Sequence, residues 1–566
     1  MTERPGAAGL SAPGHEPLYA PRPSFWLGRI ATLELAPHLA RVAVAFLGVL
    51  LLIPNTPLLR RMPGPDSGVF LYVAQQMLHG QVPYRDVWDH KPPLIYFIDL
   101  IAVAMTPGSL WGIWLIQVVS IAIAALLGLA VMRRAVGLWP AVFASAIWLV
   151  TSRTLIERDA NYTEAFALPL QFAALFLLAR PQANRGGPGR WFLFGATGAL
   201  ALCLRQTLIG TWLAIAGYLV LAGLGSRPSR TLMARLLAAA LGIACVVVPI
   251  GTYFVVHGAT AALLDSTVSY NVYYANTSLG ARGLALFGVF ESLSGSGLGF
   301  IAASGWIVGM TALLGQSGRL RRFDPLLAVA LLDFPLEIVL AGASGRQYPH
   351  YALTCLPSAA VLAAFVVKSL AEMLRARPLV DPLRVPGPVG LAALLVAACV
   401  VPVKVILSDS LVRAPLEATS RQAAEYVLRT TGPTDPVLVW GGAVEVNFVS
   451  GRPSPTRFPY QLPLFLPGYQ SGALFNSLLR DLQERPPALI VDATNSVPEV
   501  PSLAQAQRQQ YRDSKRGRML PEAAAVFTYI CTHYQLADTV GPLEWPVYAR
   551  RSSAPAAGDA ETPPTC

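Results

Sequence analysis

The chain has 566 residues, of which 54% are hydrophobic and only 13% are charged, far below the roughly 25% of charged residues in a soluble domain. This composition excludes a soluble globular enzyme and predicts a polytopic α-helical membrane protein. The net charge is +11, but the excess arginines fall in short loops between apolar runs. They therefore act as topology signals and do not form a nucleic-acid surface.

Residues 1–40 are expected to form a flexible cytoplasmic leader, because the start of the chain is rich in Pro and Gly and lacks the apolar core of a cleavable signal peptide. Residues 41–407 predict a transmembrane domain with about eleven spans. The runs that are long enough to cross a bilayer lie at 42–59, 110–132, 138–150, 165–179, 191–204, 207–224, 236–256, 298–314, 326–340, 351–367 and 389–407.

A shorter apolar segment, 94–106, contains Asp99 and ends at Pro107-Gly108, so we expect it to lie in the membrane interface as a re-entrant or in-plane helix. With this placement, and with the N-terminus inside, every later arginine cluster falls on the cytoplasmic side, as the positive-inside rule requires. The polar loops, including the long loop 257–295, then share the external face.

The composition changes after residue 407, where charge rises and short strand-like runs at 436–440 and 488–491 alternate with helical segments near 421–429 and 472–482. We expect residues 408–551 to form a small α/β extracytoplasmic domain, followed by a disordered tail at 552–566. Four of the six cysteines lie inside apolar runs without any metal-binding spacing, which is typical of inert packing residues.

A polar segment follows the first span and begins at Asp66, just after Pro63-Gly64-Pro65. Apolar residues at helical spacing behind Asp66 predict a short amphipathic helix along the membrane. A carboxylate near the positive end of such a helix stays ionised and can act as a base. The alternative is that Asp66 only caps the helix.

Lys91 lies between His90 and the pair Pro92-Pro93, which fixes the backbone. An ammonium group at the interface suits a lipid phosphate, although the same lysine could simply snorkel. His90 could be a metal ligand, a proton carrier or a structural residue.

Further ionisable residues lie at the ends of later spans. Glu164 begins a span after the loop that holds Asp159 and Asn161, and its carboxylate could face the first loop. Two arginines in other external turns, Arg205 and Arg346, could bind a phosphate with Lys91. Alternatively, these arginines pair with Asp333 and Glu337, which lie one turn apart inside a span.

No phosphate-binding loop, dinucleotide fingerprint or serine-nucleophile motif lies between a strand and a helix. A nucleotide-driven or serine-hydrolase mechanism is therefore disfavoured.

In order along the chain, the polar motifs resemble those of GT-C membrane glycosyltransferases of glycosyltransferase family 39, which includes protein O-mannosyltransferases and lipid A aminoarabinose transferases. The resemblance covers about residues 40–410. The matching motifs are Asp66-Ser67-Gly68, Gly80-x-x-Pro83-Tyr84-x-Asp86, Lys91-Pro92-Pro93, Asn161-Tyr162-Thr163-Glu164, Arg205-Gln206-Thr207 and His350-Tyr351.

The resemblance implies an inverting transfer from a polyprenyl-phosphate sugar to a lipid, polysaccharide or protein acceptor at the external face of the plasma membrane. It implies that Asp66 is the catalytic or acceptor-orienting acid, that Glu164 is the second-loop acid and that Lys91 contacts the donor phosphate. We therefore expect Asp66 and Glu164 to be catalytic, and Arg205 and Arg346 to bind the donor phosphate with Lys91. The expected substrate contacts are Tyr84, Asp86, His90, Asp159, Asn161, His350 and Tyr351. Some relatives carry Glu where this chain has His90, so a divalent metal at His90 stays an open possibility.

A transporter or flippase for an amphipathic solute is the alternative from another functional class. Such a protein should have helices broken by Gly or Pro in two corresponding halves, whereas the polar residues of this chain concentrate on one face.

Overall fold

The computed structural model describes residues 36–156, 160–179, 187–223, 230–315, 323–375, 415–497, 499–513 and 519–551. Most of the predicted leader, the predicted span 389–407, the tail 552–566 and the expected substrate contact Asp159 lie outside these ranges.

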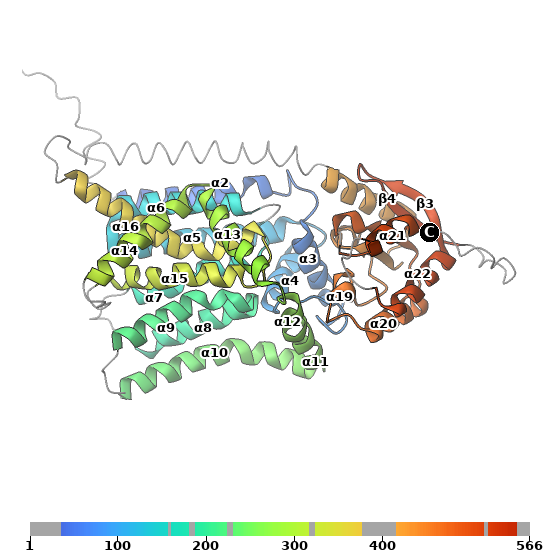
Figure 1. Cartoon of the computed structure of the whole chain (residues 1–566), viewed down its shortest axis with the longest axis horizontal. Helices are drawn as coiled ribbons and strands as arrows, with labels where there is room; N and C mark the ends of the chain where they lie inside the picture. Colours follow the sequence, from blue (N-terminus) through green and yellow to red (C-terminus); the bar gives the residue numbers. More distant parts are fainter. Residues whose placement is uncertain are drawn as a thin grey trace, which may run out of the picture.

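A bundle of roughly parallel helices forms one part of the molecule, and a smaller α/β part sits at one end of it (Figure 1). Long apolar sequences without charged interruptions favour helices of this kind, because all backbone hydrogen bonds are made within the segment. The bundle contains α2 (Ala36–Leu51), α5 (Trp111–Val136), α6 (Leu138–Leu155), α7 (Thr163–Leu178), α8 (Pro188–Leu204), α9 (Gly210–Gly223), α10 (Arg230–Val256), α13 (Leu279–Ser294), α14 (Leu298–Gly315), α15 (Pro325–Gly342) and α16 (Leu356–Arg375).

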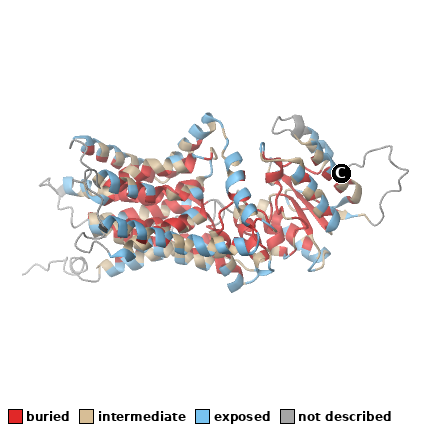
Figure 2. Cartoon of the chain, turned by 90° about the horizontal axis from the view of Figure 1, so that it is seen from below, coloured by how far each residue is buried: buried red, intermediate tan, exposed pale blue. Residues whose placement is uncertain are grey.

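Seven segments of the described chain are long and apolar enough to cross a membrane, while α7, α8 and the segment Gln206–Ala222 are shorter. Ten of the eleven predicted spans thus fall on helices, and the eleventh lies outside the described residues. The outer faces of the bundle carry exposed residues and the inner faces are buried (Figure 2). Exposed Leu, Ile and Val on such a surface suit contact with lipid.

Basic side chains gather at the end of the bundle that lies away from the α/β part. The ammonium of Lys368, near the end of α16, donates to the carbonyl of Ala135 at the end of α5. Arg190 donates to the carbonyl of Leu178, and Arg134 lies 4.2 Å from the ring centroid of Phe176. This grouping agrees with the arrangement that the arginine clusters predicted.

Short helices occupy the junction between the bundle and the α/β part (Figure 1): α3 (Pro65–Leu78), α4 (Leu94–Met105), α11 (Thr260–Leu264) and α12 (Tyr270–Tyr274). The expected interfacial segment 94–106 is the 12-residue helix α4. The expected long loop 257–295 is mostly helical: it holds α11, a π-helical turn at Asp265–Ser269, α12 and α13.

Helix α3 forms where the sequence predicted a helix, but protein surrounds it. Residues 67–74 are all buried, and α3 packs against α4 and against α18 (Glu445–Ser450) of the α/β part. The N-cap is Gly64, and Asp66 lies in the first turn without capping the helix. Asp66 is therefore left at the positive end of a buried helix.

The α/β part contains a four-stranded sheet in the order β1-β2-β4-β3. The two predicted strands are confirmed as β1 (Val437–Gly441) and β2 (Leu489–Ala493), which pair in parallel and are fully buried. Strands β3 (Tyr534–Val540) and β4 (Trp545–Arg550) complete the sheet with antiparallel pairing. A helix over residues 415–430, α19 (Leu462–Phe465), α20 (Gly472–Glu484), α21 (Gln505–Asp513) and α22 (Pro521–His533) join it.

The two parts approach each other closely. A Cβ atom on Gly68 of α3 would lie 2.9 Å from the backbone nitrogen of Glu445, so only glycine fits there without displacement. The backbone N–H of Ser454 donates to the Tyr72 hydroxyl at 2.7 Å. Met62, which precedes α3, is buried in a hydrophobic cluster with Ala423 and other residues of the α/β part.

Candidate active site

Two cavities lie where the bundle meets the α/β part. The first, with a volume of about 370 Å³, is lined only by residues of the helical part, among them Arg205, Gln206, Thr267 and Asn271. We call it the membrane-domain cavity. Val268 and Val272 on its rim are 54% and 65% exposed. An opening flanked by exposed valines suits an apolar chain.

The second cavity has a volume of about 390 Å³ and is lined by both parts of the molecule, so we call it the interdomain cavity. Asp66, Arg346, Tyr348 and His350 line it from the helical part, together with several aromatic rings. The α/β part contributes Gly442, Tyr460, Leu462, Val497 and Glu499.

The two cavities share four lining residues: His90, Lys91, Tyr274 and Tyr351. A side chain in this shared wall can contact molecules on both sides. Within the described residues, the Lys91 ammonium has no hydrogen bond or ion pair of its own. Its charge is thus available to an anion.

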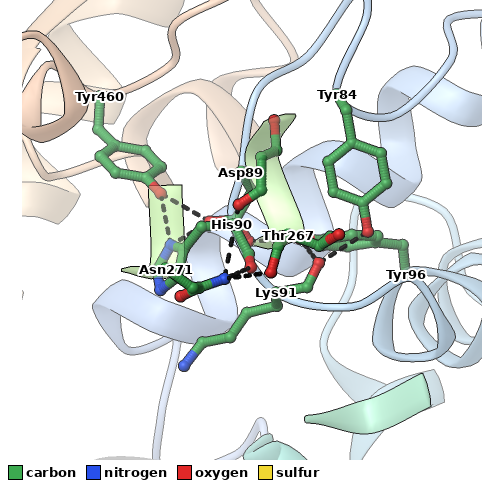
Figure 3. Close-up of polar contacts among 9 residues, drawn as sticks. Tyr84, Asp89, His90, Lys91, Tyr96, Thr267, Asn271 and Tyr460 are labelled. Atoms are coloured by element: carbon green, nitrogen blue, oxygen red, sulfur yellow. Dashed lines mark hydrogen bonds and ion pairs between the residues drawn. The ribbon is translucent and has the colours of Figure 1, made fainter. Parts of the chain in front are cut away.

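Tyrosine hydroxyls hold the backbone beneath Lys91 (Figure 3). The hydroxyl of Tyr84 donates to the Lys91 carbonyl at 2.7 Å, and that of Tyr96 lies 3.2 Å from the same oxygen. Tyr84 has a φ of 70°, a left-handed conformation that is unusual for a bulky residue. The strained turn of Tyr84 directs its ring inward toward the Lys91 backbone, where the ring is completely buried.

The carboxylate of Asp89 connects three side chains in the same place. It accepts hydrogen bonds of 2.6 Å from the hydroxyls of Tyr96 and Tyr460, and it lies 3.2 Å from Nδ1 of His90. Burial raises the pKa of Asp89, but the hydrogen bond and charge of His90 and the bonds from the two tyrosines outweigh it. Together they lower the pKa from 3.8 to about 2.

Acid should therefore weaken the folded state through Asp89. Because the folded pKa of about 2 lies below the ordinary value of 3.8, Asp89 stabilises the protein above about pH 4, and the stabilisation is lost as the pH falls toward 2. We expect Asp89→Asn to be less stable than the wild type by about 2 kcal/mol near neutral pH. The difference in unfolding free energy between the wild type and Asp89→Asn should shrink in unfolding curves recorded at decreasing pH. A difference that does not change with pH would contradict the lowered pKa of Asp89.

Glu164 and Arg205 meet behind the shared wall. Glu164, in the first turn of α7, forms a direct ion pair with Arg205 at the end of α8, and both side chains are buried. The guanidinium of Arg205 also lies over the Tyr351 ring at 3.7 Å, which is a favourable cation–π distance. The sequence motifs at three helix ends are thus brought together.

The alternative pairing of the arginines with Asp333 and Glu337 does not occur. Thr211 donates to Asp333 at 3.1 Å, and Gln171 donates to Glu337 at 3.1 Å. Arg346 lies instead with its guanidinium 4.8 Å from the Tyr274 ring centroid. The two arginines therefore remain at the cavities.

Of the twelve predicted site residues, six line the interdomain cavity and four line the membrane-domain cavity, with His90, Lys91 and Tyr351 common to both. His350 lines the interdomain cavity, and its ring stacks on that of Tyr162 with the centroids 4.2 Å apart. Glu164 reaches the site through Arg205.

Three expected substrate contacts bond to protein groups and line neither cavity. The Tyr84 hydroxyl holds the Lys91 carbonyl, as described above. Asp86 pairs with Arg85 and accepts from the N–H of Val82. Asn161 is completely buried and donates to Ser67 at 3.0 Å and to Asp99 at 2.9 Å. The positions of these residues suit support of the loops that carry the site.

Sequence reasoning missed Tyr274, Asn271 and Tyr460. Asn271 donates to the His90 carbonyl at 2.9 Å and to the Thr267 carbonyl at 2.9 Å (Figure 3). Tyr460 lies 370 positions beyond His90 in the sequence. The only sequence signal for these three residues was a local composition rich in aromatic or polar residues. Such a composition does not reveal a partner so far along the chain.

In the described part of the chain, no three His, Cys, Asp or Glu side chains come together as metal ligands would. Asp89 and His90 form the nearest approach to such a set, but the Nδ1 atom of His90 faces Asp89 and Tyr460. A divalent metal at His90 would need further ligands from beyond the described residues.

Comparison with known proteins gives one family and one fold. Residues 34–378 match the family model of the competence-induced protein Ccs4 N-terminal domain. No curated protein matches the sequence significantly.

Two solved structures of ArnT from Cupriavidus metallidurans share the architecture. The structure bound to undecaprenyl phosphate has 14% identity and a TM-score of 0.61, over 92% of this chain and 99% of ArnT. The apo structure has 13% identity and a TM-score of 0.59, over 91% and 98% of the two chains. The fold is that of a GT-C membrane glycosyltransferase, as the motifs predicted.

Proposed function

The chain belongs to the family of the competence-induced protein Ccs4 N-terminal domain, and for this member we propose an inverting glycosyltransferase that uses a polyprenyl-phosphate sugar. The acceptor is a lipid, polysaccharide or protein outside the cytoplasm. The observation that carries the proposal is the unpaired ammonium of Lys91 in the wall between two cavities, with Asp66 in the lining of one of them.

The membrane-domain cavity is the proposed donor site. Its valine-flanked opening suits a polyprenyl chain, and Lys91 and Arg205 in its lining suit the phosphate. One ArnT structure of the same fold contains undecaprenyl phosphate, which supports a lipid-linked donor. Glu164 neutralises part of the charge of Arg205 and fixes its position beside Tyr351.

The interdomain cavity is the proposed acceptor site. Its tyrosine and histidine rings give faces on which sugars or other cyclic groups can stack, while its charged groups can bind hydroxyls. Asp66 lines this cavity, which supports a contact between its carboxylate and the acceptor.

The proposed reaction is a single displacement. Asp66 takes a proton from the nucleophilic group of the acceptor, whose atom bonds to the anomeric carbon from the face opposite the phosphate. The bond between that carbon and the phosphate oxygen breaks, and its electron pair leaves with the phosphate. Lys91 stabilises the negative charge that develops on the leaving group.

Lys91→Ala should weaken the binding of undecaprenyl phosphate to the purified protein by about 10- to 150-fold, since a hydrogen bond to a charged group contributes roughly 1.5 to 3 kcal/mol. The matched control is Lys368→Ala, because Lys368 bonds to a backbone carbonyl at the opposite end of the bundle. Equal affinities in the wild type and Lys91→Ala would remove Lys91 from the phosphate site. Transfer from labelled polyprenyl-phosphate sugars tests the activity itself.

The proposed site should face away from the cytoplasm. In a cysteine-free background, single cysteines in place of the exposed residues His79, Asn276 and Thr539 should react with an impermeant thiol reagent applied to intact cells. A cysteine in place of exposed Glu372, near the end of α16 that carries Lys368, should react only after lysis. The reverse pattern would place the site in the cytoplasm and contradict the proposal.

A further inference from the structure

Tyr460 of the α/β part reaches into the loop that carries Lys91 (Figure 3). Its hydroxyl donates to Oδ1 of Asp89 at 2.6 Å and lies 3.2 Å from Nδ1 of His90. The ring packs edge-on against Trp88, with centroids 5.6 Å apart, and Tyr460 is only 8% exposed. One tyrosine from the α/β part therefore contacts three consecutive residues just before Lys91.

The hydrogen bonds indicate which nitrogen of the His90 ring carries a hydrogen. Tyr460 has a single hydroxyl proton, which points to the carboxylate of Asp89. Nδ1 of His90 lies 3.2 Å from Oδ1 of that carboxylate and 3.2 Å from the tyrosine oxygen, so Nδ1 must carry a hydrogen. Otherwise its lone pair would face two oxygen atoms that have no proton to offer it. The ring orientation of His90 thus depends on Tyr460 and Asp89 together.

The backbone of the loop is held from both parts. The N–H of Trp88 donates to the carbonyl of Arg457 in the α/β part at 2.7 Å, and the other backbone contacts come from the helical part. Asn271 donates to the His90 carbonyl and Tyr84 donates to the Lys91 carbonyl. The hydroxyl of Tyr96 donates to Asp89 and lies 3.2 Å from the Lys91 carbonyl. These contacts fix the backbone. Tyr460 and Asp89 contact Nδ1 of His90, whose ring also lies against Tyr270 and Tyr274. His90 lines both cavities beside Lys91, so its ring shapes the wall on which the donor and acceptor meet.

We propose that Tyr460 is a positioning residue that acts through Asp89 on His90 and Lys91, so that the α/β part is a component of the donor phosphate site. This inference rests on the proposed function. It assigns to the α/β part a role in donor binding in addition to its share of the acceptor-side lining. Support of this kind from a second layer of residues sets the geometry of groups that touch a ligand.

Tyr460→Phe tests the inference, because it removes the hydroxyl and keeps the ring against Trp88. We expect the dissociation constant of undecaprenyl phosphate to rise about tenfold, in line with the loss of a hydrogen bond to a charged group. The matched control is Tyr469→Phe. Tyr469 also belongs to the α/β part, and its hydroxyl donates to the carboxylate of Asp265 at 2.6 Å. Its ring centroid lies 6.4 Å from that of Trp88, yet Tyr469 lines neither cavity.

A double-mutant cycle separates positioning from general docking of the two parts. If Tyr460 acts through Asp89, then Asp89→Asn combined with Tyr460→Phe should raise the dissociation constant little more than Asp89→Asn alone. Additive losses would overturn the inference, and so would an equal loss in Tyr469→Phe. Thermal unfolding of each variant shows whether it is folded. Should Tyr460→Phe fail to fold, the dissociation constant of Asp89→Asn tests the connection between Asp89 and the phosphate site. An unchanged dissociation constant in Asp89→Asn would contradict the inference.

The outcomes also distinguish this inference from the proposed function. Wild-type protein that does not bind undecaprenyl phosphate contradicts both. Wild-type binding with an unchanged dissociation constant in Tyr460→Phe contradicts only the positioning role. In transfer assays, Tyr460→Phe should raise the KM for the donor more than it lowers kcat. The reason is that Tyr460 acts on the groups that bind the phosphate only through Asp89.

Discussion

Asp66→Asn is expected to lower the rate of transfer by about 10²- to 10⁴-fold, because the substitution keeps the shape of the side chain and removes the proposed general base. Asp66 lies in the first turn of α3 and lines the interdomain cavity. It does not line the membrane-domain cavity. The binding of undecaprenyl phosphate should therefore stay near the wild-type value while turnover collapses.

The control for this experiment is Asp265→Asn, since Asp265 is exposed and lines neither cavity. It should retain transfer. Near wild-type turnover in Asp66→Asn would remove Asp66 from the role of base. Loss of donor binding together with turnover would instead show that the substitution disturbs α3, in which residues 67–74 are all buried.

Glu164→Gln is expected to destabilise the folded protein by roughly 3 to 5 kcal/mol, because it leaves the buried guanidinium of Arg205 without its carboxylate. The side chain of Glu164 is 2% exposed and that of Arg205 is 11% exposed, so water can replace little of the lost interaction. The measurement is thermal unfolding of the protein in detergent, which does not depend on knowing the substrates.

The double variant Glu164→Gln/Arg205→Gln is the decisive comparison. Removing both charges should cost less than the sum of the two single substitutions, since the cost of an unpaired buried charge disappears. Additive losses would mean that the two residues do not stabilise each other. A Glu164→Gln protein that unfolds like the wild type would contradict the ion pair altogether.

The sequence predicted most of the helical part, because long apolar runs have few alternatives to a membrane-spanning helix. Glu164, Arg205 and His350 could be placed at one end of the bundle from the charge of the loops alone. In the structure Glu164 pairs with Arg205, while Arg205 and His350 line adjoining cavities. The roles of these residues in a reaction stay predictions. The extracytoplasmic orientation stays a prediction, as do the boundaries of the domains.

What the sequence could not reveal depends on contacts across long separations. The surroundings of α3 are one example: its apolar spacing predicted a helix at the membrane surface, but α18 covers it. Tyr460 is another, because a tyrosine between two loops has no periodicity that points to Asp89. The distinction between residues that line a cavity and residues that brace it, such as Asn161, also requires the folded structure.

The way in which the two parts share their interiors bears on how proteins of this kind can change. Met62 belongs to the apolar cluster of the α/β part, and Trp440 and Phe448 belong to the large cluster that continues into the helical bundle. Gly68 leaves no space for even a methyl group against Glu445.

The α/β part cannot simply be exchanged for that of a relative, because its removal would expose apolar residues on both parts of the molecule. For the acceptor site proposed above, a new acceptor range would have to arise by substitution of residues in the walls of the interdomain cavity. The separate expression of residues 415–551 should yield an aggregation-prone fragment for the same reason.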